Sequence, residues 1–463
     1  MPVVTEERNI CVNYFHILLL YTALIVCVSC NEKAANPQPN APKITEKVSG
    51  FRAVFSEPTA VPGAAGLVGT KQFAFSSYGT DQPFWIGLNE NASGYTALLT
   101  RVDTTGKVLT TKSLFNFTTD LAATPDGGCW IAGYGILSHL DANGVVDNSH
   151  VLTNDNNGQG VLYNSIHSTI DNGCIITCTE FDEKSEKRFL VSGKVDSQGK
   201  IEYLNSYEYP GNPISSAQLK NGNVLVLGGT LSNTNKTIIL TELNQQNIVK
   251  NIEITINEPY VNFSRINFKI FAMQDNSIAI SDSDNSLFIH LDRELNLLKS
   301  LSIAGLFTRT GGVYVSENGT VGMVGESPNY VNNTILPQGL YYTEFNINSQ
   351  PENASCIEMN PDGKWTADYG RLLNTQGLYR YFLGNLMAPI NGGVPISFRV
   401  IKVKSSNPKS CASNDSKIPL TINSINLTTK ATNSVLKTIL PISNKPYSFK
   451  TGSSNIQATK KCD

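Results

Sequence analysis

Short stretches of alternating apolar and polar residues recur along most of the chain, and each is bounded by a turn that contains glycine or asparagine. One unit has an Asp-Gly or Asn-Gly type turn, a short β-branched strand, a second alternating strand ending in Asp or Asn, a polar turn and a third strand. Alternation with a period of two between turn signals is typical of half-buried strands. The pattern therefore predicts an all-β protein.

The unit repeats at a spacing that predicts the architecture. Clear copies cover residues 125–144, 171–199 and 220–244, and weaker copies cover 274–292 and 317–346. The strand-ending positions 103, 141, 196, 244, 292, 346 and about 403 are separated by 38 to about 57 residues. Such a period is typical of β-propeller blades. We expect a single β-propeller of about seven four-stranded blades over residues 49–405, and six or eight blades also fit the repeat count.

The unit resembles the blade repeat of bacterial surface-lipoprotein propellers. The resemblance rests on strand ends of the form hydrophobic-Lys/Thr-hydrophobic-Asp-x-x-Gly, as in residues 99–106 and 192–199, and it covers roughly residues 60–405. It implies the propeller fold and an exported lipoprotein. It says little about activity, because this architecture hosts binding, scaffold and enzyme roles alike.

The first residues predict export. Residues Tyr14–Val28 form an apolar run of about 15 residues, which is short for a membrane-spanning helix but suits the hydrophobic region of a signal peptide. Val28-Ser29-Cys30 then resembles the end of a bacterial lipobox, in which the cysteine is lipid-modified and becomes the new N-terminus. We expect a lipoprotein signal peptide over residues 1–29 and lipid, such as palmitate, on Cys30. Cleaved secretion and an uncleaved N-terminal anchor stay open as alternatives.

Residues 30–48 are polar and rich in proline, and they predict a flexible tether between the lipid and the folded body. We therefore place the protein at the cell envelope, anchored to the outer membrane, with the membrane leaflet undetermined. After residue 405 the pattern changes to an alternating Thr/Ile/Asn stretch. Residues 406–463 predict a short C-terminal strand extension packed on the propeller.

Composition and cysteine content narrow the chemistry. The formal net charge of −2 argues against a nucleic-acid binder, which needs a concentrated basic surface. Six cysteines lie beyond the anchor: Cys129, Cys174, Cys178, Cys356, Cys411 and Cys462. Cys174 and Cys178 lie on one face of one strand at about 13 Å, too far to bond each other, and buried free thiols explain them best. Propellers of the resembled kind can tie their last segment with a cysteine pair, which implies Cys411 with Cys462.

Motif-borne catalysis finds no support in the sequence. The body has no nucleophile elbow, zinc-protease helix, P-loop or dinucleotide fingerprint, and its histidines form no metal-ligand spacing with the cysteines. We expect no cofactor, metal or catalytic residue. The Asp-x-x-Gly segments at Asp103, Asp141 and Asp196 predict turns rather than calcium loops, because a calcium loop needs alternating carboxylates.

Aromatic residues in the last third give the one hint of a ligand surface. Tyr330, Trp365, Tyr369 and Tyr379 lie in or beside the longer inter-strand segments, where propellers place recognition. We therefore expect a non-enzymatic binding or scaffold module for a protein or glycan. A glycan-active hydrolase or lyase, with two or more carboxylates about 5–10 Å apart at the central channel, stays open. So does a structural subunit of an outer-membrane assembly.

Overall fold

The computed structural model divides the chain into two units, Met1–Val48 and Ser49–Asp463, and all the described residues lie in the second. The described stretches are 52–56, 72–76, 82–90, 96–114, 118–133, 135–155, 158–182, 187–231, 236–245, 247–257, 268–282, 287–304, 307–326, 330–331, 334–335, 339–359, 371–373, 379–385, 397–404, 417–438, 440–447, 451–453 and 457–462. Every regular element in these stretches is a β-strand, and none is a helix that could cross a membrane.

The strands form seven five-stranded antiparallel sheets, each with its first strand innermost and its fifth strand outermost. Sheet 1 is β2 (Gln72–Ser76), β3 (Phe84–Glu90), β4 (Thr96–Val102), β5 (Val108–Leu114) and β36 (Thr451–Ser453). Sheet 2 is β6 (Thr118–Ala123), β7 (Cys129–Gly133), β8 (Ile136–Leu140), β9 (Val146–Asn154) and β35 (Ile442–Pro446). Sheet 3 is β10 (Leu162–Ser168), β11 (Cys174–Asp182), β12 (Lys187–Val195), β13 (Ile201–Glu208) and β34 (Leu436–Thr438).

The other four sheets follow in chain order. Sheet 4 is β14 (Asn212–Gln218), β15 (Val224–Leu231), β16 (Lys236–Leu243), β17 (Ile248–Ile256) and β33 (Leu427–Ala431). Sheet 5 is β18 (Phe268–Ala272), β19 (Ile278–Asp282), β20 (Leu287–Leu291), β21 (Leu297–Ala304) and β32 (Thr421–Ser424). Sheet 6 is β22 (Phe307–Val315), β23 (Thr320–Glu326), β26 (Gly339–Asn346), β27 (Asn353–Met359) and β31 (Lys417–Pro419), and β24 (Tyr330–Val331) and β25 (Thr334–Ile335) form a small hairpin. Sheet 7 is β28 (Arg371–Leu373), β29 (Tyr379–Asn385), β30 (Ser397–Lys404), β1 (Arg52–Ser56) and β37 (Gln457–Cys462).

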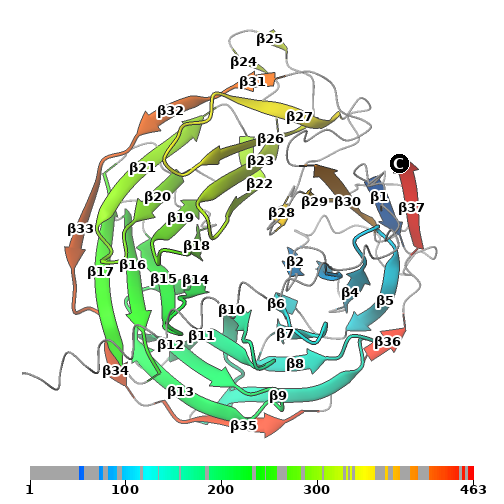
Figure 1. Ribbon diagram of the computed structural model, residues 1–463. Helices are drawn as coiled ribbons and strands as arrows, with labels where there is room; N and C mark the ends of the chain where they lie inside the picture. Colours follow the sequence, from blue (N-terminus) through cyan, green and yellow to red (C-terminus); the bar gives the residue numbers. More distant parts are fainter. Residues whose placement is uncertain are drawn as a thin grey trace, which may run out of the picture. The chain divides into compact units, whose positions relative to one another are not determined.

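The sheets of this unit are arranged around a common axis as a β-propeller (Figure 1). The hydrophobic clusters lie between successive sheets: one joins sheets 2 and 3, another joins sheets 4 and 5, and a third joins sheets 5 and 6. A four-stranded meander exposes an apolar face that the neighbouring sheet covers, so each sheet is stabilised by stacking. The ring closes through sheet 7, where the N-terminal strand β1 pairs with β30.

The repeated turns are built by side-chain oxygens that accept backbone N–H groups. The Oδ1 atoms of Asp103, Asp141 and Asp196 each accept hydrogen bonds at 2.8–2.9 Å from the N–H groups two and four residues later. In each turn the glycine three residues after the aspartate has a φ of 74–86°, a conformation that glycine adopts without strain. The prediction that these segments are turns is confirmed.

The connections distinguish the two ends of the ring. Consecutive antiparallel strands run in opposite directions, so connections alternate between two faces. On one face, which we call the turn face, the first strand of each sheet joins the second, and in sheets 1 to 6 the third joins the fourth. These connections have seven residues or fewer. On the other, the loop face, the second strand joins the third, and each sheet joins the next.

The five longest connections between successive ring strands all leave the loop face. They are residues 57–71, 257–267, 327–338 (which include β24 and β25), 360–370 and 386–396. The two faces therefore differ in the length of their connections: the turn face has short connections, and the loop face has the longest ones.

The fifth strand of every sheet comes from the C-terminal segment. Strands β31 to β37 pair in turn with β27, β21, β17, β13, β9, β5 and β1, so the segment runs backward around the outside of the ring (Figure 1, orange to red). We call residues 417–462 the belt. Among the belt residues whose burial the structure describes, the buried apolar side chains are Ile418, Ile425, Leu427 and Val435. The expectation of four-stranded blades is wrong for this reason: the belt adds a strand to each.

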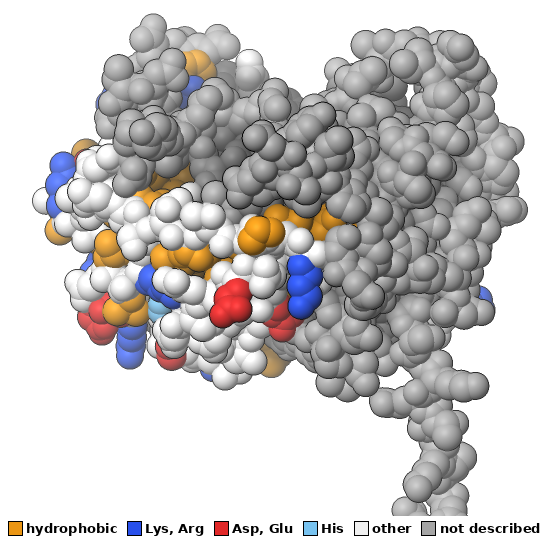
Figure 2. Space-filling model, turned by 90° about the horizontal axis from the view of Figure 1, so that it is seen from above, with side chains coloured by type: hydrophobic (Ala, Val, Ile, Leu, Met, Phe, Trp, Pro, Cys, Tyr) orange, Lys and Arg blue, Asp and Glu red, His pale blue; other side chains and the backbone are white. Residues whose placement is uncertain are grey.

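The outer surface is chemically mixed. In the view from above in Figure 2, hydrophobic side chains lie between polar ones, and acidic and basic side chains gather toward the lower rim of the described part. A belt side chain contributes to this mixture, since Lys430 pairs with Glu253 at 3.0 Å. Exposed ion pairs of this kind stabilise a fold only weakly.

Candidate functional site

Polar side chains connect the innermost strands of neighbouring sheets. β6, β10 and β14 each carry a register irregularity next to Asp120, Ser165 and Ser215, respectively. Asp120 Oδ2 accepts the N–H of Ile166 on β10 at 2.8 Å, and Ser215 Oγ accepts the N–H of Ile270 on β18 at 3.3 Å. A bulge leaves backbone groups outside the ladder, and here side chains of one sheet satisfy backbone groups of the next.

His167 is the centre of this polar region. Its Nε2 atom lies 2.9 Å from Ser216 Oγ on β14 and 3.2 Å from Ser165 Oγ on its own strand. Thr177 extends the network from β11, with its hydroxyl 3.2 Å from Ser216 Oγ. Both serines are buried, whereas His167 and Asp120 are only half-buried. We call Asp120, Ser165, His167 and Ser216 the axial cluster.

Burial shifts the pKa values of two members of this cluster, Asp120 and His167. Burial raises the pKa of Asp120, although the N–H groups of Ile166 and Leu121 and the charges of His167 and Lys269 oppose the rise. Burial lowers the pKa of His167, although the Asp120 carboxylate and a hydrogen bond with Ser216 oppose the fall. A lowered pKa favours the neutral imidazole, whose unprotonated ring nitrogen can accept a hydrogen bond from a serine hydroxyl.

The axial cluster offers hydroxyl, imidazole and carboxyl groups to a polar ligand. A hydrolase of the expected kind would need a pair of carboxylates. Across the seven innermost strands as the structure describes them, Asp120 is the one acidic residue. The two-carboxylate geometry is thus not found on these strands. Nor do the described residues contain a group of three His, Cys, Asp or Glu side chains placed to hold a metal ion.

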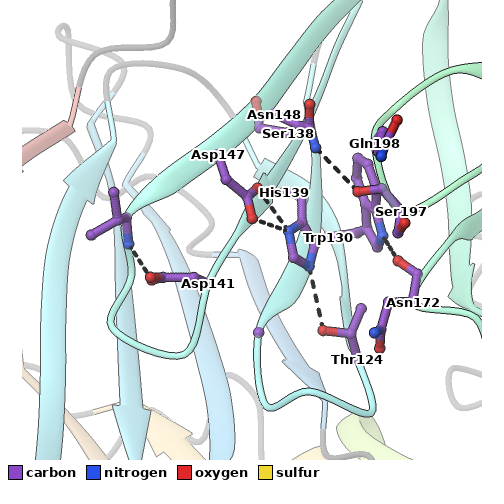
Figure 3. A network of polar contacts seen from close by, with 12 residues as sticks. Thr124, Trp130, Ser138, His139, Asp141, Asp147, Asn148, Asn172, Ser197 and Gln198 are labelled. Carbon is purple, nitrogen blue, oxygen red and sulfur yellow. Dashed lines mark hydrogen bonds and ion pairs between the residues drawn. The ribbon is translucent and has the colours of Figure 1, made fainter.

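A second polar network lies at the turn face of sheet 2 (Figure 3). His139 Nδ1 lies 2.8 Å from Asp147 Oδ1, and its Nε2 lies 3.4 Å from Thr124 Oγ1. The Thr124 hydroxyl donates to Asp126 Oδ1 at 2.6 Å, and His139 packs against the Trp130 ring at a centroid distance of 4.9 Å. The order carboxylate, imidazole, hydroxyl has the composition of a catalytic triad, but the hydroxyl already donates to a carboxylate.

Sheet 3 repeats this network with a lysine in place of the histidine. Lys194 Nζ contacts Asp171 at 2.7 Å and Glu202 at 3.1 Å, and the Thr169 hydroxyl donates to Asp171. Hydrogen bonds from Lys194 and Thr169 lower the pKa of Asp171 from 3.8 to about 2. Equivalent positions in two blades therefore hold a nitrogen-bearing side chain beside an acidic one, which favours a structural role for His139.

The structure describes the backbone of two of the four aromatic residues that we expected to form a ligand surface. Tyr330 lies on β24, within the loop-face connection 327–338. Tyr379 is the first residue of β29, which begins at the turn face. Trp365 and Tyr369 lie outside the described residues, in the connection between β27 and β28.

Some of the cysteines lie among the described residues and others lie outside them. Cys129, Cys174 and Cys178 are buried thiols without a disulfide, as predicted for the pair on β11, and burial raises the pKa of each. Cys30 and Cys411 lie outside the described residues. The backbone of Cys462 lies on β37 opposite Arg52. The lipid site and the Cys411–Cys462 disulfide therefore stay predictions.

Sequence reasoning missed the axial cluster. Asp120 and His167 each stand four to six residues before an Asp-Gly or Asp-Asn turn, on strands whose alternation looks ordinary. Aligning the repeats against each other shows where polar residues occupy inner-strand positions, which is the signal that was available. The interblade contacts themselves have no sequence signature.

Comparison with known proteins assigns neither a family nor an activity to the chain. No protein-family model matches the chain, and no curated protein matches it. Among solved structures, a streptogramin B lyase is 10% identical, with 76% of this chain and 97% of that chain covered and a TM-score of 0.45. A virginiamycin B lyase from Staphylococcus aureus is 10% identical, with 76% and 99% covered and a TM-score of 0.40. A protein of unknown function from Bacteroides caccae is 11% identical, with 57% and 91% covered and a TM-score of 0.37.

Proposed function

We propose that the protein is an envelope-anchored binding module that recognises a protein or glycan through the loop face of its propeller. The observation that carries this proposal is the asymmetry of the ring: the five longest connections between its strands all leave one face. Connecting segments on a rigid scaffold are where binding residues concentrate. The turn face, by contrast, uses its polar side chains to hold its own backbone.

The anchor completes the proposal. The apolar run before Ser29-Cys30 supports a lipid-modified Cys30, and the tether of residues 30–48 would let the ring stand off the outer membrane. A single lipid chain binds a membrane only marginally, whereas two or more hold a protein stably.

Shortening the loop face is the test of recognition. Residues 257–267 and 327–338 are each replaced by a four-residue turn of the length found between β19 and β20. We expect the variant to lose at least about tenfold in the amount of envelope component or glycan that it captures, since about 1.4 kcal/mol of binding energy corresponds to tenfold. The readouts are capture from detergent-solubilised envelopes with mass spectrometry, and a glycan array.

The matched control changes the opposite face. Ile170, which is 88% exposed, and Lys220 both lie in turn-face connections, and I170S with K220A removes their side chains while leaving the loop face intact. We expect this variant to capture the same components as the wild type. Loss of capture by the turn-face variant, or full capture by a correctly folded loop variant, would contradict the proposal.

The anchor is tested separately. The full-length protein is expected to incorporate radiolabelled palmitate and to enter the detergent phase on Triton X-114 partition, and C30A is expected to do neither. Incorporation of label by C30A would show that lipid is attached elsewhere. Absence of label from the unaltered protein would favour cleaved secretion or an uncleaved apolar anchor, which cell fractionation distinguishes.

A further inference from the structure

Two histidines occupy equivalent positions in sheets 2 and 5. His139 lies on β8 and His290 lies on β20, the third strands of their sheets, and each is directly paired with a residue of the fourth strand. The partner of His139 is Asn148, whereas the partner of His290 is Lys299. Side chains directly opposite each other on neighbouring strands have Cβ atoms about 4.5–5.5 Å apart. His290 is therefore next to an ammonium group, where His139 is next to a neutral amide.

Asn148 and Lys299 both hold the sheet that follows their own. The Asn148 amide donates to the carbonyl of Ser197 in the β12–β13 turn of sheet 3 at 3.1 Å. Lys299 Nζ donates to the carbonyls of Ile347 and Ser349 in the β26–β27 connection of sheet 6, at 3.0 and 2.9 Å. We call these two hydrogen bonds of Lys299 the charged joint. Burial lowers the pKa of Lys299, so this ammonium group is poorly placed to tolerate a second positive charge.

His290 lacks the partners that His139 has. The ring of His139 lies between a carboxylate and a hydroxyl group. The corresponding positions of sheet 5 hold Leu298, which precedes Lys299 and is 56% exposed, and Met273. His290 is buried, and its Nε2 atom has no hydrogen-bond partner among the described residues. A proton on this ring would therefore put a charge in a buried position without an acceptor at Nε2.

The strands and turns around His290 carry charged groups of both signs from three sheets. Glu317 bonds to the β18–β19 turn through Gln274, and Lys250 bonds to the backbone of the β20–β21 turn. The described charged groups are Asp275, Asp292, Arg293, Glu294 and Lys299 of sheet 5, Lys250 of sheet 4 and Glu317 of sheet 6.

Burial is the main reason why His290 favours its neutral form. Burial lowers the pKa of His290, and the charge of Lys299 adds to this fall, whereas Asp275 and Asp292 oppose it. In an unfolded chain a histidine has its ordinary pKa of about 6.5. The stability that neutral His290 contributes is therefore complete above this pH and is lost as the pH falls through it.

We propose that His290 and Lys299 form a pH-sensitive contact that loosens the charged joint between sheets 5 and 6 in acid. This inference does not depend on the proposed function. A proton on His290 puts a second positive charge directly opposite Lys299, and like charges in this arrangement are destabilising. The ammonium group then moves away from the carbonyls of Ile347 and Ser349. Sheets 2 and 3, which are joined through the neutral Asn148, keep their contact.

Hydrogen exchange of the full-length protein in detergent, followed by mass spectrometry, tests this contact. The reporter is the β18–β19 turn, because the N–H of Gln274 donates to the carbonyl of Glu317 in sheet 6 at 2.7 Å. The internal reference is the β6–β7 turn, where the N–H of Asp126 donates to Asn172 of sheet 3 at 3.2 Å. Between pH 7.5 and pH 5.5 we expect the protection factor of the reporter to fall about threefold to tenfold relative to the reference. About tenfold is the most that one histidine proton gives one unit below a pKa of about 6.5.

Two substitutions at the contact are expected to abolish this acid response. H290Q removes the group that titrates, so the reporter and the reference should change equally. K299Q keeps a hydrogen-bond donor at the joint without its charge, so a proton on His290 no longer meets a like charge. Persistence of the acid response in H290Q would assign it to another group and overturn the proposal. Persistence in K299Q would show that Lys299 takes no part, which also overturns it.

A third variant restores the missing partner and does not alter the buried residues. L298D supplies the carboxylate that sheet 2 has at this position, and it should remove most of the acid response because the carboxylate pairs with the protonated ring. The matched control is L109D, the same change at the equivalent exposed position of sheet 1, where Arg101 stands in place of the histidine. L109D is expected to respond to acid as the wild type does. Equal responses in L298D and L109D, or equal changes of the reporter and the reference in the wild type, would overturn the proposal even if H290Q did not fold.

Discussion

Removal of residues 417–463 is expected to leave a chain that does not fold. The belt supplies one strand to each of the seven sheets and buries Ile418, Ile425, Leu427 and Val435. Burying a side chain of this size stabilises a protein by about 1.5–3 kcal/mol, so four of them contribute roughly 6–12 kcal/mol. Whole domains are stable by only about 5–15 kcal/mol. The truncated chain would also expose the outer edges of its sheets, which favours aggregation.

The measurement is the soluble yield and the urea unfolding midpoint of the truncated chain against the full chain. A milder variant gives a quantitative result if the truncated chain is insoluble: Ile418 is completely buried, and I418A is expected to cost about 2–5 kcal/mol. The matched control is T429A, because Thr429 is an exposed belt residue on β33, where a change of less than about 0.5 kcal/mol is expected. A truncated chain that is soluble and has the same urea unfolding midpoint as the full chain would show that the belt is dispensable.

The turns were predictable from sequence because their chemistry is local. Asp141 accepts hydrogen bonds from the N–H groups of Asn143 and Val145, so the residues that make the turn are all within four positions of each other. The same holds for Asp103 and Asp196, and these turns give the spacing that identifies a propeller.

The fifth strands were not predictable in this way. A belt strand such as β34 has three residues, and its partner β13 lies more than 220 positions earlier in the chain. Its hydrogen bonds to the ring are equally remote, since Ser206 donates to the carbonyl of Thr438 and accepts from the N–H of Leu440. The sequence predicted a short strand extension packed on the propeller, but nothing within the segment indicates that it adds one strand to every sheet.

The axial cluster shows a related limit. Asp120, His167 and Ser216 come from three sheets, and each looks like an ordinary polar position on its own strand. Their contact arises from the radial stacking of neighbouring sheets, which brings the inner strands β6, β10 and β14 together. A propeller therefore brings together polar groups that are far apart in its sequence.

Replacing Trp130 is expected to have the largest effect of any single substitution at an interface between blades. Trp130 is completely buried between sheets 2 and 3, and its indole N–H donates to the carbonyl of Asn172 at 2.9 Å. Trp85 makes the equivalent contact one blade earlier, to the carbonyl of Gly127 at 3.2 Å. W130A removes both the packing and the hydrogen bond and should cost about 3–5 kcal/mol. W130F keeps most of the ring volume and should cost about 1–3 kcal/mol, because the Asn172 carbonyl loses its donor.

The matched control keeps the acceptor and removes only its side chain. Asn172 has a φ of 61°, so N172G retains the backbone carbonyl in a conformation that glycine adopts freely. Its side chain accepts one hydrogen bond, from the N–H of Asp126 at 3.2 Å on an exposed turn, and N172G should therefore change the free energy of unfolding by less than about 1 kcal/mol. Urea unfolding followed by far-ultraviolet circular dichroism gives all three values. If W130F were as stable as the wild type while N172G lost several kcal/mol, the turn side chain rather than the tryptophan would hold the two blades together.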